Sequence, residues 1–454
     1  MLGVVGAGTM GAGIAQLGVG AGMRTLLHDP IPEALEEGTE KTRGGLRKWA
    51  ERGREVDESL LAATGSLEQL AECELIIEAA PERLELKREL FQGISEIAPD
   101  AVLASNTSSI PITTIASAAA HPENVVGMHF FNPAPLMKLV EVIEADQTGT
   151  RALELARAAG GAMGKRVIDA ADGPGFLVNR CGRPFYTEAL RLLQERVATH
   201  EQIDRICRMG GGFRMGPFEL MDLVGIDTGF EVAKSFTELS FGEPRWRPNP
   251  IQARMVAAGR LGRKAGRGYY DYSEEPYRPE DPEAPGAVGL DLGEAEVELL
   301  SCATRSLAGQ GQPAAVGYSL VPGPETAHLV ELTRLPATPR DACDAAEHFF
   351  RDRGLHPEWV ADAPGLVLAR IVCQLVNEAA FAIGEGVGSP EDVDAGLTLG
   401  LNHPRGPVEW GNAIGIEQVL SVVDGLYDDR REERYRAAPL LRRAATLGEW
   451  PPPT

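Results

Sequence analysis

Cysteine is scarce in this sequence, and long apolar runs are absent. The six cysteines, at positions 73, 181, 207, 302, 343 and 373, lie far apart and include no C-x-x-C pair. We therefore expect neither a disulfide framework nor a metal site, and we interpret the cysteines as reduced thiols. No apolar run approaches the roughly 20 residues that span a bilayer, which excludes a membrane-spanning protein. The first five residues enter a strand pattern directly, without a secretory signal, so we expect a cytoplasmic protein.

Positively charged residues are also fewer than negatively charged ones. The chain has 44 Lys and Arg against 66 Asp and Glu, a net charge of −22. Nucleic-acid binding needs a basic face, so this balance argues against a nucleic-acid partner. One predicted helix, over residues 31–54, is an exception that concentrates Lys41, Arg43, Arg47, Lys48, Arg52 and Arg54. Alone, this pattern indicates a solvated helical face; the alternative is contact with an anionic ligand.

Alternating strands and helices predict the fold of the first part of the chain. Apolar patterns indicate strands at 4–5, 25–29, 75–77, 102–104, 125–128 and 140–143, with a helix at 12–21. This alternation predicts an α/β Rossmann domain with a doubly wound, mostly parallel sheet. After residue 173 the periods become helical, as at 183–195 and 201–209, which predicts an all-α domain.

An internal repeat organises the rest of the chain. Residue types recur 190 positions later in the pairs Pro174/Pro364, Arg180/Arg370, Glu188/Glu378, Asp204/Asp394, Gly216/Gly406 and Gly225/Gly415. A constant offset without gaps indicates a duplicated helical domain. We therefore expect a Rossmann domain at 1–172, a helical domain at 173–272, a linker and remnant segment at 273–315, and a second, degenerate copy at 316–454.

The loop Gly6-Ala7-Gly8-Thr9-Met10-Gly11 fits the dinucleotide-binding pattern G-x-G-x-x-G. Gly6 permits a tight turn, Gly8 lets the backbone approach a pyrophosphate, and Gly11 lets helix and strand pack closely. The diphosphate would meet the free N–H groups of the helix N-terminus. Asp29 ends the next strand, where it would accept hydrogen bonds from ribose hydroxyls and repel a 2′-phosphate, which favours NAD over NADP. The alternative is a purely structural glycine turn.

A second group of polar residues carries the candidate chemistry. It consists of Ser105-Asn106-Thr107-Ser108-Ser109, His129-Phe130-Phe131-Asn132-Pro133 and Lys138-Leu139-Val140-Glu141. Oxidation of an alcohol requires a base for the hydroxyl proton, and histidine has a suitable pKa. Glu141 would fix the tautomer of His129 if the intervening chain folds back. From spacing alone, the alternatives are a hydrogen-bonded core histidine, a structural ion-pair partner at Glu141 and a helix N-cap in the Ser/Thr/Asn run.

Six motifs in combination resemble the 3-hydroxyacyl-CoA dehydrogenases. They are GAGTMGAGIA (6–15), SNTSS (105–109), HFFNP (129–133), MKLVEV (137–142), PGFLVNR (174–180) and MGPFELMD (215–222). The resemblance covers residues 1–272 and implies oxidation of an (S)-3-hydroxyacyl-CoA to the 3-oxoacyl-CoA with NAD. The second half resembles longer bacterial members, which include 3-hydroxyadipyl-CoA dehydrogenases of phenylacetate degradation and some 3-hydroxybutyryl-CoA dehydrogenases. We therefore expect a role in phenylacetate or fatty-acid type degradation.

The resemblance also implies roles for single residues. The implied catalytic residues are the base His129, its partner Glu141, and the substrate-holding Ser108 and Asn179. The implied cofactor contacts are Gly6, Gly8, Thr9, Met10, Gly11, Asp29, Glu82, Lys87 and Asn106, and the expected substrate contacts are Ser108, Asn132, Asn179, Lys48 and Arg52. The chain departs from the common pattern at Gly45 and Arg52, where many members have serine and lysine, and at Arg214, where proline is common.

The second copy is expected to lack an active site. In the register of the repeat, His129 falls on Ser319, Asn179 on Ala369 and Glu141 on Glu331. We therefore expect the copy to pack on the first helical domain as an intrachain pseudo-dimer in place of a second subunit. Further homo-oligomers are compatible with the sequence.

Two other functions fit part of the sequence. A free 3-hydroxyacid dehydrogenase also has a Rossmann G-x-G-x-M-G loop, but it uses a lysine in its helical domain and gives the H-F-F-N-P segment no role. A non-catalytic, cofactor-binding structural protein would not need His129, Glu141, Ser108 and Asn179 together.

Overall fold

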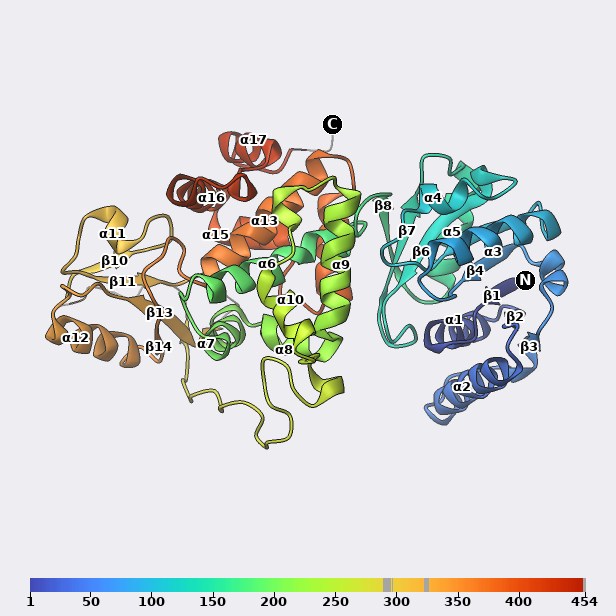
Figure 1. The fold of residues 1–454 in the computed structure, drawn as a ribbon, viewed down its shortest axis with the longest axis horizontal. Helices are drawn as coiled ribbons and strands as arrows, with labels where there is room; N and C mark the ends of the chain where they lie inside the picture. The colour runs from blue at the N-terminus through green and yellow to red at the C-terminus, as the bar shows by residue number, and fades with distance from the viewer. Residues whose placement is uncertain (289–294, 296, 322–325, 452–454) are drawn as a thin grey trace. The chain divides into compact units, whose positions relative to one another are not determined.

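The computed structural model describes residues 1–288, 295, 297–321 and 326–451. The chain divides into two compact units (Figure 1). The first comprises residues 1–178 and 387–400, and the second comprises residues 179–386 and 401–454. The four segments expected from the sequence stay predictions, and the structure adds that residues 387–400 pack with the first unit.

The first unit is built on an eight-stranded sheet with the order β3-β2-β1-β4-β5-β6-β7-β8, whose strands run from blue to turquoise in Figure 1. Neighbouring strands are parallel except β6 and β7, which are antiparallel. The strands are β1 (Leu2–Val5), β2 (Thr25–His28), β3 (Leu61–Thr64), β4 (Leu75–Glu78), β5 (Val102–Ser105), β6 (Val125–Phe130), β7 (Leu139–Glu144) and β8 (Arg166–Ala171). The helices are α1 (Thr9–Gly20), α2 (Pro32–Glu51), α3 (Leu84–Ile97), α4 (Ile112–Ala116), α5 (Thr150–Ala162) and α14 (Pro390–Ala395). The predicted doubly wound, mostly parallel sheet is confirmed.

Both faces of this sheet are covered. On one face, α1, α2 and α5 form a buried cluster with the strands that includes Ile14, Leu46 and Ala156. Gly127 of β6 points to the opposite face, where an added Cβ would meet Ile112 of α4. Strands buried on both faces carry near-continuous apolar runs, which explains why the sequence pattern indicates the central strands.

The two edge strands, β3 and β8, are not predicted by the sequence. β3 buries only its first and last residues, and β8 exposes Arg166 and Asp169. An edge strand has a neighbour on one side only, so its apolar pattern is shorter and weaker.

The second unit is mainly helical, as the sequence predicts. Its first helix, α6 (Val178–Gln194), begins at the last residue of the first unit. The others are α7 (His200–Arg205), α8 (Pro217–Val224), α9 (Ile226–Leu239), α10 (Pro250–Ala257), α11 (Leu307–Gln310), α12 (Arg340–Arg351), α13 (Leu368–Gly384), α15 (Pro407–Ile414), α16 (Ile416–Arg430) and α17 (Pro439–Leu447).

A smaller sheet lies in the second unit, where the sequence analysis proposed no strands. Its order is β10 (Leu299–Ser301), β11 (Val316–Ser319), β13 (Leu329–Thr333) and β14 (His356–Trp359). The orientations along it are parallel, antiparallel and parallel, the same as along β5-β6-β7-β8 of the large sheet. Two further short strands, β9 (Ala287–Val288) and β12 (Thr326–Ala327), pair with each other. The expected linker and remnant at 273–315 therefore contains β9, β10 and α11.

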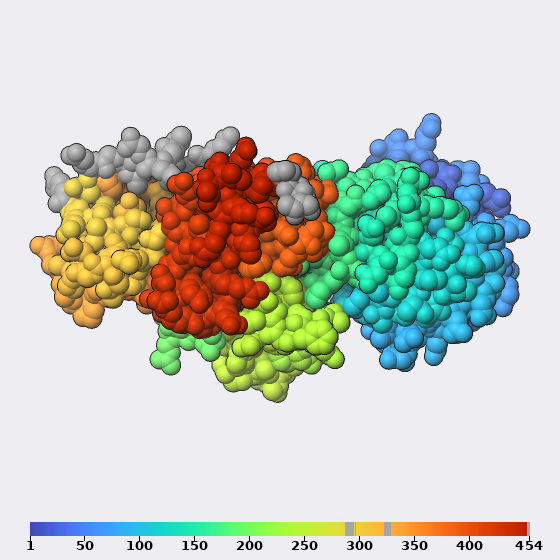
Figure 2. Space-filling model, turned by 90° about the horizontal axis from the view of Figure 1, so that it is seen from above, coloured from blue at the N-terminus to red at the C-terminus, as the bar shows by residue number. Residues whose placement is uncertain are grey.

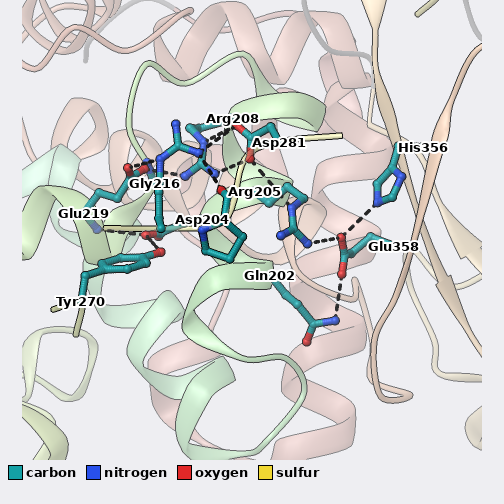
Figure 3. Close-up of polar contacts among 12 residues, drawn as sticks. Gln202, Asp204, Arg205, Arg208, Gly216, Glu219, Tyr270, Asp281, His356 and Glu358 are labelled. Carbon is teal, nitrogen blue, oxygen red and sulfur yellow. Dashed lines mark hydrogen bonds and ion pairs between the residues drawn. The ribbon is translucent and has the colours of Figure 1, made fainter. Parts of the chain in front are cut away.

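Segments distant in sequence meet within the second unit. The short turns η5 (Pro244–Trp246) and η8 (Glu433–Tyr435) are in contact, and Figure 2 shows the red C-terminal surface beside the yellow-green surface of the earlier helices. Polar contacts join the end of α7 and the turn that follows it to later segments (Figure 3). Arg208 Nε donates to Asp281 Oδ2 at 2.8 Å, and Arg205 Nη1 donates to Glu358 Oε2 of β14 at 2.9 Å.

The cysteines at 73, 181, 207, 302, 343 and 373 are all free and buried. In the part of the chain that the structure describes, no set of three His, Cys, Asp or Glu side chains is placed to hold a metal ion. Over the same residues, no helix has both the length and the apolar character needed to cross a membrane.

Candidate active site

The glycine-rich loop joins β1 to α1 and has the geometry of a phosphate-binding turn. Gly6 has a φ of +98°, and an added Cβ would lie 2.7 Å from the carbonyl oxygen of Ala79. At Gly11, an added Cβ would lie 1.7 Å from the carbonyl oxygen of Gly6. A Cβ at Gly8, by contrast, would have nothing within 4 Å, so the space before the helix is open. Because α1 has no side-chain cap, its first N–H groups are available to an anion.

Asp29 follows β2 and fastens this loop. Its Oδ2 accepts a hydrogen bond from the N–H of Ala7 at 2.9 Å, and its Oδ1 accepts one from the N–H of Ile31 at 3.0 Å. A carboxylate has about four acceptor positions, so the side chain can also accept from ribose hydroxyls. Thr9 lies at the exposed start of α1, and Met10 is half-buried beside it.

A buried lysine organises the loops after β4 and β5. Lys87 Nζ donates to Glu78 Oε1 at 2.7 Å and to the carbonyl oxygen of Ala80 at 3.3 Å, and it lies 3.4 Å from Glu82 Oε2. Glu78 Oε2 in turn accepts from the Ser105 hydroxyl at 2.7 Å. Sequence analysis missed Glu78, for which the available signal was a polar residue at the carboxyl end of a buried strand. It included Ser105 in the candidate group without assigning it a role.

Glu82 holds the segment Thr107 to Ser109. Its Oε1 accepts from the Thr107 hydroxyl at 2.6 Å and from the N–H groups of Ser108 and Ser109 at 3.0 and 3.1 Å. Burial alone raises the pKa of Glu82, but Lys87 and these donors outweigh burial and lower the pKa below its usual value. Glu82 therefore stays ionised and fixes the backbone at Ser108.

His129 and Glu141 face each other across the antiparallel strands β6 and β7, where they are register partners. The distance from His129 Nδ1 to Glu141 Oε2 is 2.6 Å, and both side chains are buried. The other carboxylate oxygen of Glu141 accepts from the N–H groups of Leu177 and Val178 at 3.2 and 3.0 Å. The carboxylate is thus held at both oxygens, one of which contacts His129 Nδ1.

The remaining predicted residues lie in different surroundings. Asn106 Oδ1 accepts from the N–H of Phe130 at 2.8 Å, so Asn106 ties the loop after β5 to the strand that carries His129. Asn132 is exposed just beyond β6, and Lys48 and Arg52 are exposed at the end of α2. Asn179 belongs to the second unit, where it lines a cavity beside α6. The structure thus groups Glu82, Lys87 and Ser108, and it pairs His129 with Glu141.

Two protein-family models match this chain. Residues 1–173 match the model described as "3-hydroxyacyl-CoA dehydrogenase, NAD binding domain". Residues 175–272 and 365–452 match the model described as "3-hydroxyacyl-CoA dehydrogenase, C-terminal domain". The chain belongs to the 3-hydroxyacyl-CoA dehydrogenase family.

Individual members of the family are similar over different lengths. The 3-hydroxyadipyl-CoA dehydrogenase of Escherichia coli K12 is 37% identical, with 98% of this chain and 97% of that protein covered. A probable 3-hydroxybutyryl-CoA dehydrogenase of Deinococcus radiodurans is 40% identical, with 60% of this chain and 99% of that protein covered. The crystal structure of a 3-hydroxybutyryl-CoA dehydrogenase from E. coli K12 matches with a TM-score of 0.91 and 36% identity, covering 99% of this chain and 98% of that one.

NAD is the cofactor of this family member, and the loop residues fit it. The open space at Gly8 and the uncapped N-terminus of α1 suit a diphosphate, and Asp29 suits a ribose without a 2′-phosphate. The predicted NAD-dependent oxidoreductase is therefore confirmed at the level of family and cofactor.

Proposed function

We propose that this dehydrogenase oxidises the 3-hydroxyl of an (S)-3-hydroxyacyl-CoA and that His129 is the general base. The supporting observation is the 2.6 Å contact between His129 Nδ1 and the buried carboxylate of Glu141. With the Nδ1 proton donated to Glu141, Nε2 is left to accept the proton of a substrate hydroxyl. Bound NAD supplies the acceptor for the hydride.

Glu141 is proposed as the positioning residue of this pair. Two backbone N–H groups hold and orient its carboxylate, so that it faces the imidazolium that would form when His129 takes a proton. Ser108, whose backbone is fixed by Glu82, and Asn179 are proposed to hold the 3-oxygen and the thioester region.

The remaining cofactor and substrate contacts are also proposed by residue. Gly6, Gly8, Thr9, Met10, Gly11, Asp29, Glu82 and Asn106 would hold NAD. Lys87, whose ammonium faces oxygens of Glu78, Ala80 and Glu82, would act by placing Glu82. Asn132 would lie along the acyl-CoA, and the exposed cations Lys48 and Arg52 would meet CoA phosphates. The names of the relatives include 3-hydroxyadipyl-CoA and 3-hydroxybutyryl-CoA. We propose that this chain acts on such a substrate in phenylacetate or fatty-acid type degradation.

The second half is proposed to be a duplicated, non-catalytic copy that forms an intrachain pseudo-dimer. Reciprocal contacts 190 positions apart support this: Arg180 Nε donates to Glu378 Oε1 at 2.8 Å, and Arg370 Nε donates to Glu188 Oε2 at 2.9 Å. The match of one family model to residues 175–272 and 365–452 also supports it. In this register Ser319 replaces the base.

The experiment that tests the proposal compares two histidine substitutions. His129→Gln should lower kcat for (S)-3-hydroxybutyryl-CoA by at least about 100-fold, because a positioned base contributes roughly that much or more. NAD affinity, measured by fluorescence titration, should stay near wild type. The control is His121→Gln, since His121 is exposed and its side chain pairs with the exposed Glu123. A His129→Gln enzyme with more than half of the wild-type kcat would refute the assignment.

A further inference from the structure

Helix α6 carries a buried arginine that has no hydrogen-bond or ion-pair partner among the described residues. Arg183 is 7% exposed, and among the described residues no hydrogen bond or ion pair involves its guanidinium. Its Nε is fully buried and unpartnered. The guanidinium carbon lies 4.5 Å from the ring centre of Phe236, a cation–π contact that leaves the N–H donors unused.

The other buried arginines are all paired. Arg180, Arg245 and Arg370 each donate to a buried glutamate, at 2.7 to 2.9 Å. Burial of an unpaired charge is strongly unfavourable, which is why such groups normally have a counter-ion. Burial lowers the pKa of Arg183 to about 10, so the side chain is still a cation near neutral pH.

Arg183 faces a cavity of about 200 Å³ inside the second unit. The cavity is lined by apolar groups of Met221, Val224, Val232 and Leu401, and by the polar residues Asn179, Tyr186, Thr228 and Gln252. None of the described lining residues is acidic. A cation in a cavity without a counter-ion is a site for an anionic group of a ligand.

The fold itself does not require an arginine here. In the register of the proposed duplication, Arg183 corresponds to Cys373 and Tyr186 to Val376, both buried in α13. Gly411 corresponds to Met221, and the ring of Trp450 and the side chain of Val376 lie against it. The corresponding position therefore packs with apolar groups and no charge.

We propose that Arg183 binds the distal carboxylate of a dicarboxylic acyl-CoA substrate. This rests on the proposed function, in which Asn179 holds the thioester region. Asn179 and Arg183 are four residues apart on α6 and both line the cavity, so a chain held at Asn179 reaches Arg183 after about one helical turn, roughly 6 Å. A guanidinium can donate two parallel hydrogen bonds to a carboxylate, whereas a short neutral acyl chain leaves Arg183 unpaired.

The test compares two thioesters of equal chain length. The wild-type enzyme should have a kcat/KM for (S)-3-hydroxyadipyl-CoA at least about 100-fold higher than for (S)-3-hydroxyhexanoyl-CoA, because a buried polar group without its partner is costly. Arg183→Met should reduce this ratio to below about 10, and Arg183→Lys should keep an intermediate ratio. The control Arg442→Met removes an exposed arginine paired with Asp424 and should leave the ratio unchanged.

A binding measurement separates this proposal from the proposed function. Adipyl-CoA and hexanoyl-CoA have no 3-hydroxyl, so calorimetry with them tests Arg183 without turnover. If the wild-type protein binds adipyl-CoA more tightly than hexanoyl-CoA, and Arg183→Met loses this difference, the carboxylate site is supported. This holds even if the enzyme oxidises no hydroxyacyl-CoA, because that failure would refute only the proposed function. Equal Kd values for the two ligands in wild type, or an equal loss of both in Arg183→Met, would overturn the carboxylate site.

Discussion

Glu141 and Glu331 are two buried glutamates with similar backbone contacts but different partners. Both are buried, and both accept two N–H groups, from Leu177 and Val178 in one case and from Val367 and Leu368 in the other. Glu141 faces His129 across its sheet, whereas Glu331 faces Ser319. Burial raises the pKa of Glu331 to about 8. In the proposed function, the base is present only opposite Glu141.

Asp29 should decide between NAD and NADP. Asp29→Ala should raise the KM for NAD by about 10-fold or more, because hydrogen bonds from ribose to a charged acceptor are lost. The KM for NADP should rise less, since repulsion of the 2′-phosphate is lost as well. Asp29→Asn keeps an oxygen for the N–H of Ala7 and serves as the control for loop structure. A wild-type preference for NADP in parallel kinetics would contradict this role.

Local motifs predict candidate residues, whatever their separation along the chain. The glycine loop, Asp29 and the pair His129 and Glu141 stand in segments of recognisable type, and the structure has the two side chains of that pair in contact. The ion pair between Lys87 and Glu78 is different, because Glu78 and Lys87 meet only after β4 and α3 have packed. The unpaired state of Arg183 has no sequence signal at all, since it depends on which carboxylates the fold leaves out of reach.

At the scale of elements, α6 and α13 are joined by charges rather than by apolar contacts alone. Arg180 pairs with Glu378 and Glu385, and Arg370 pairs with Glu188 and Glu195. Each helix, together with the residue that follows its end, thus offers an arginine and two glutamates at corresponding positions to the other. Such reciprocity is the pattern of an isologous interface.

Arg370→Met should therefore destabilise the protein strongly. Removing one partner of a buried ion pair typically costs about 3–5 kcal/mol, because the remaining charge stays buried. Arg370 is fully buried, and its loss would leave Glu188 and Glu195 short of a donor. The free energy of unfolding, measured by urea denaturation, should fall by that amount, against less than about 1 kcal/mol for the exposed control Arg442→Met. Equal effects of the two substitutions would contradict this account.

The small sheet shows which elements escape prediction. The orientations along β10-β11-β13-β14 repeat those along β5-β6-β7-β8, yet its strands are short, and three of the four have three or four residues. Short apolar runs do not separate strand from helix, so the periodicity that predicts the large sheet is insufficient here. The repeat at 190 positions was the better guide, because it aligns Leu139 to Glu141 of β7 with Leu329 to Glu331 of β13.

At the scale of the whole molecule, the second half is proposed to replace a partner subunit. The two halves of the chain contact each other within both units. In the first unit, the carbonyl of Val387 accepts from the N–H of Ala171. In the second unit, the carbonyl of Val197 accepts from the N–H of Ala361. These two hydrogen bonds are related by the same offset of 190 positions. Helix α13 is buried along almost its whole length, so the second half is not an appended accessory.

A chain truncated after Ser273 should therefore dimerise or lose solubility. It would keep Arg180 and Glu188 on α6 but lose Glu378 and Arg370, their partners. Two truncated chains could restore both ion pairs, since Glu188 corresponds to Glu378 and Arg180 to Arg370, and doing so would cover the apolar face of α6 again. Light scattering after size exclusion should show a dimer or aggregates, and Arg180→Glu in the truncated chain should abolish the dimer by placing like charges together. A truncated chain that is monomeric, as stable as the full chain and fully active would show that the second half does not act as a tethered subunit.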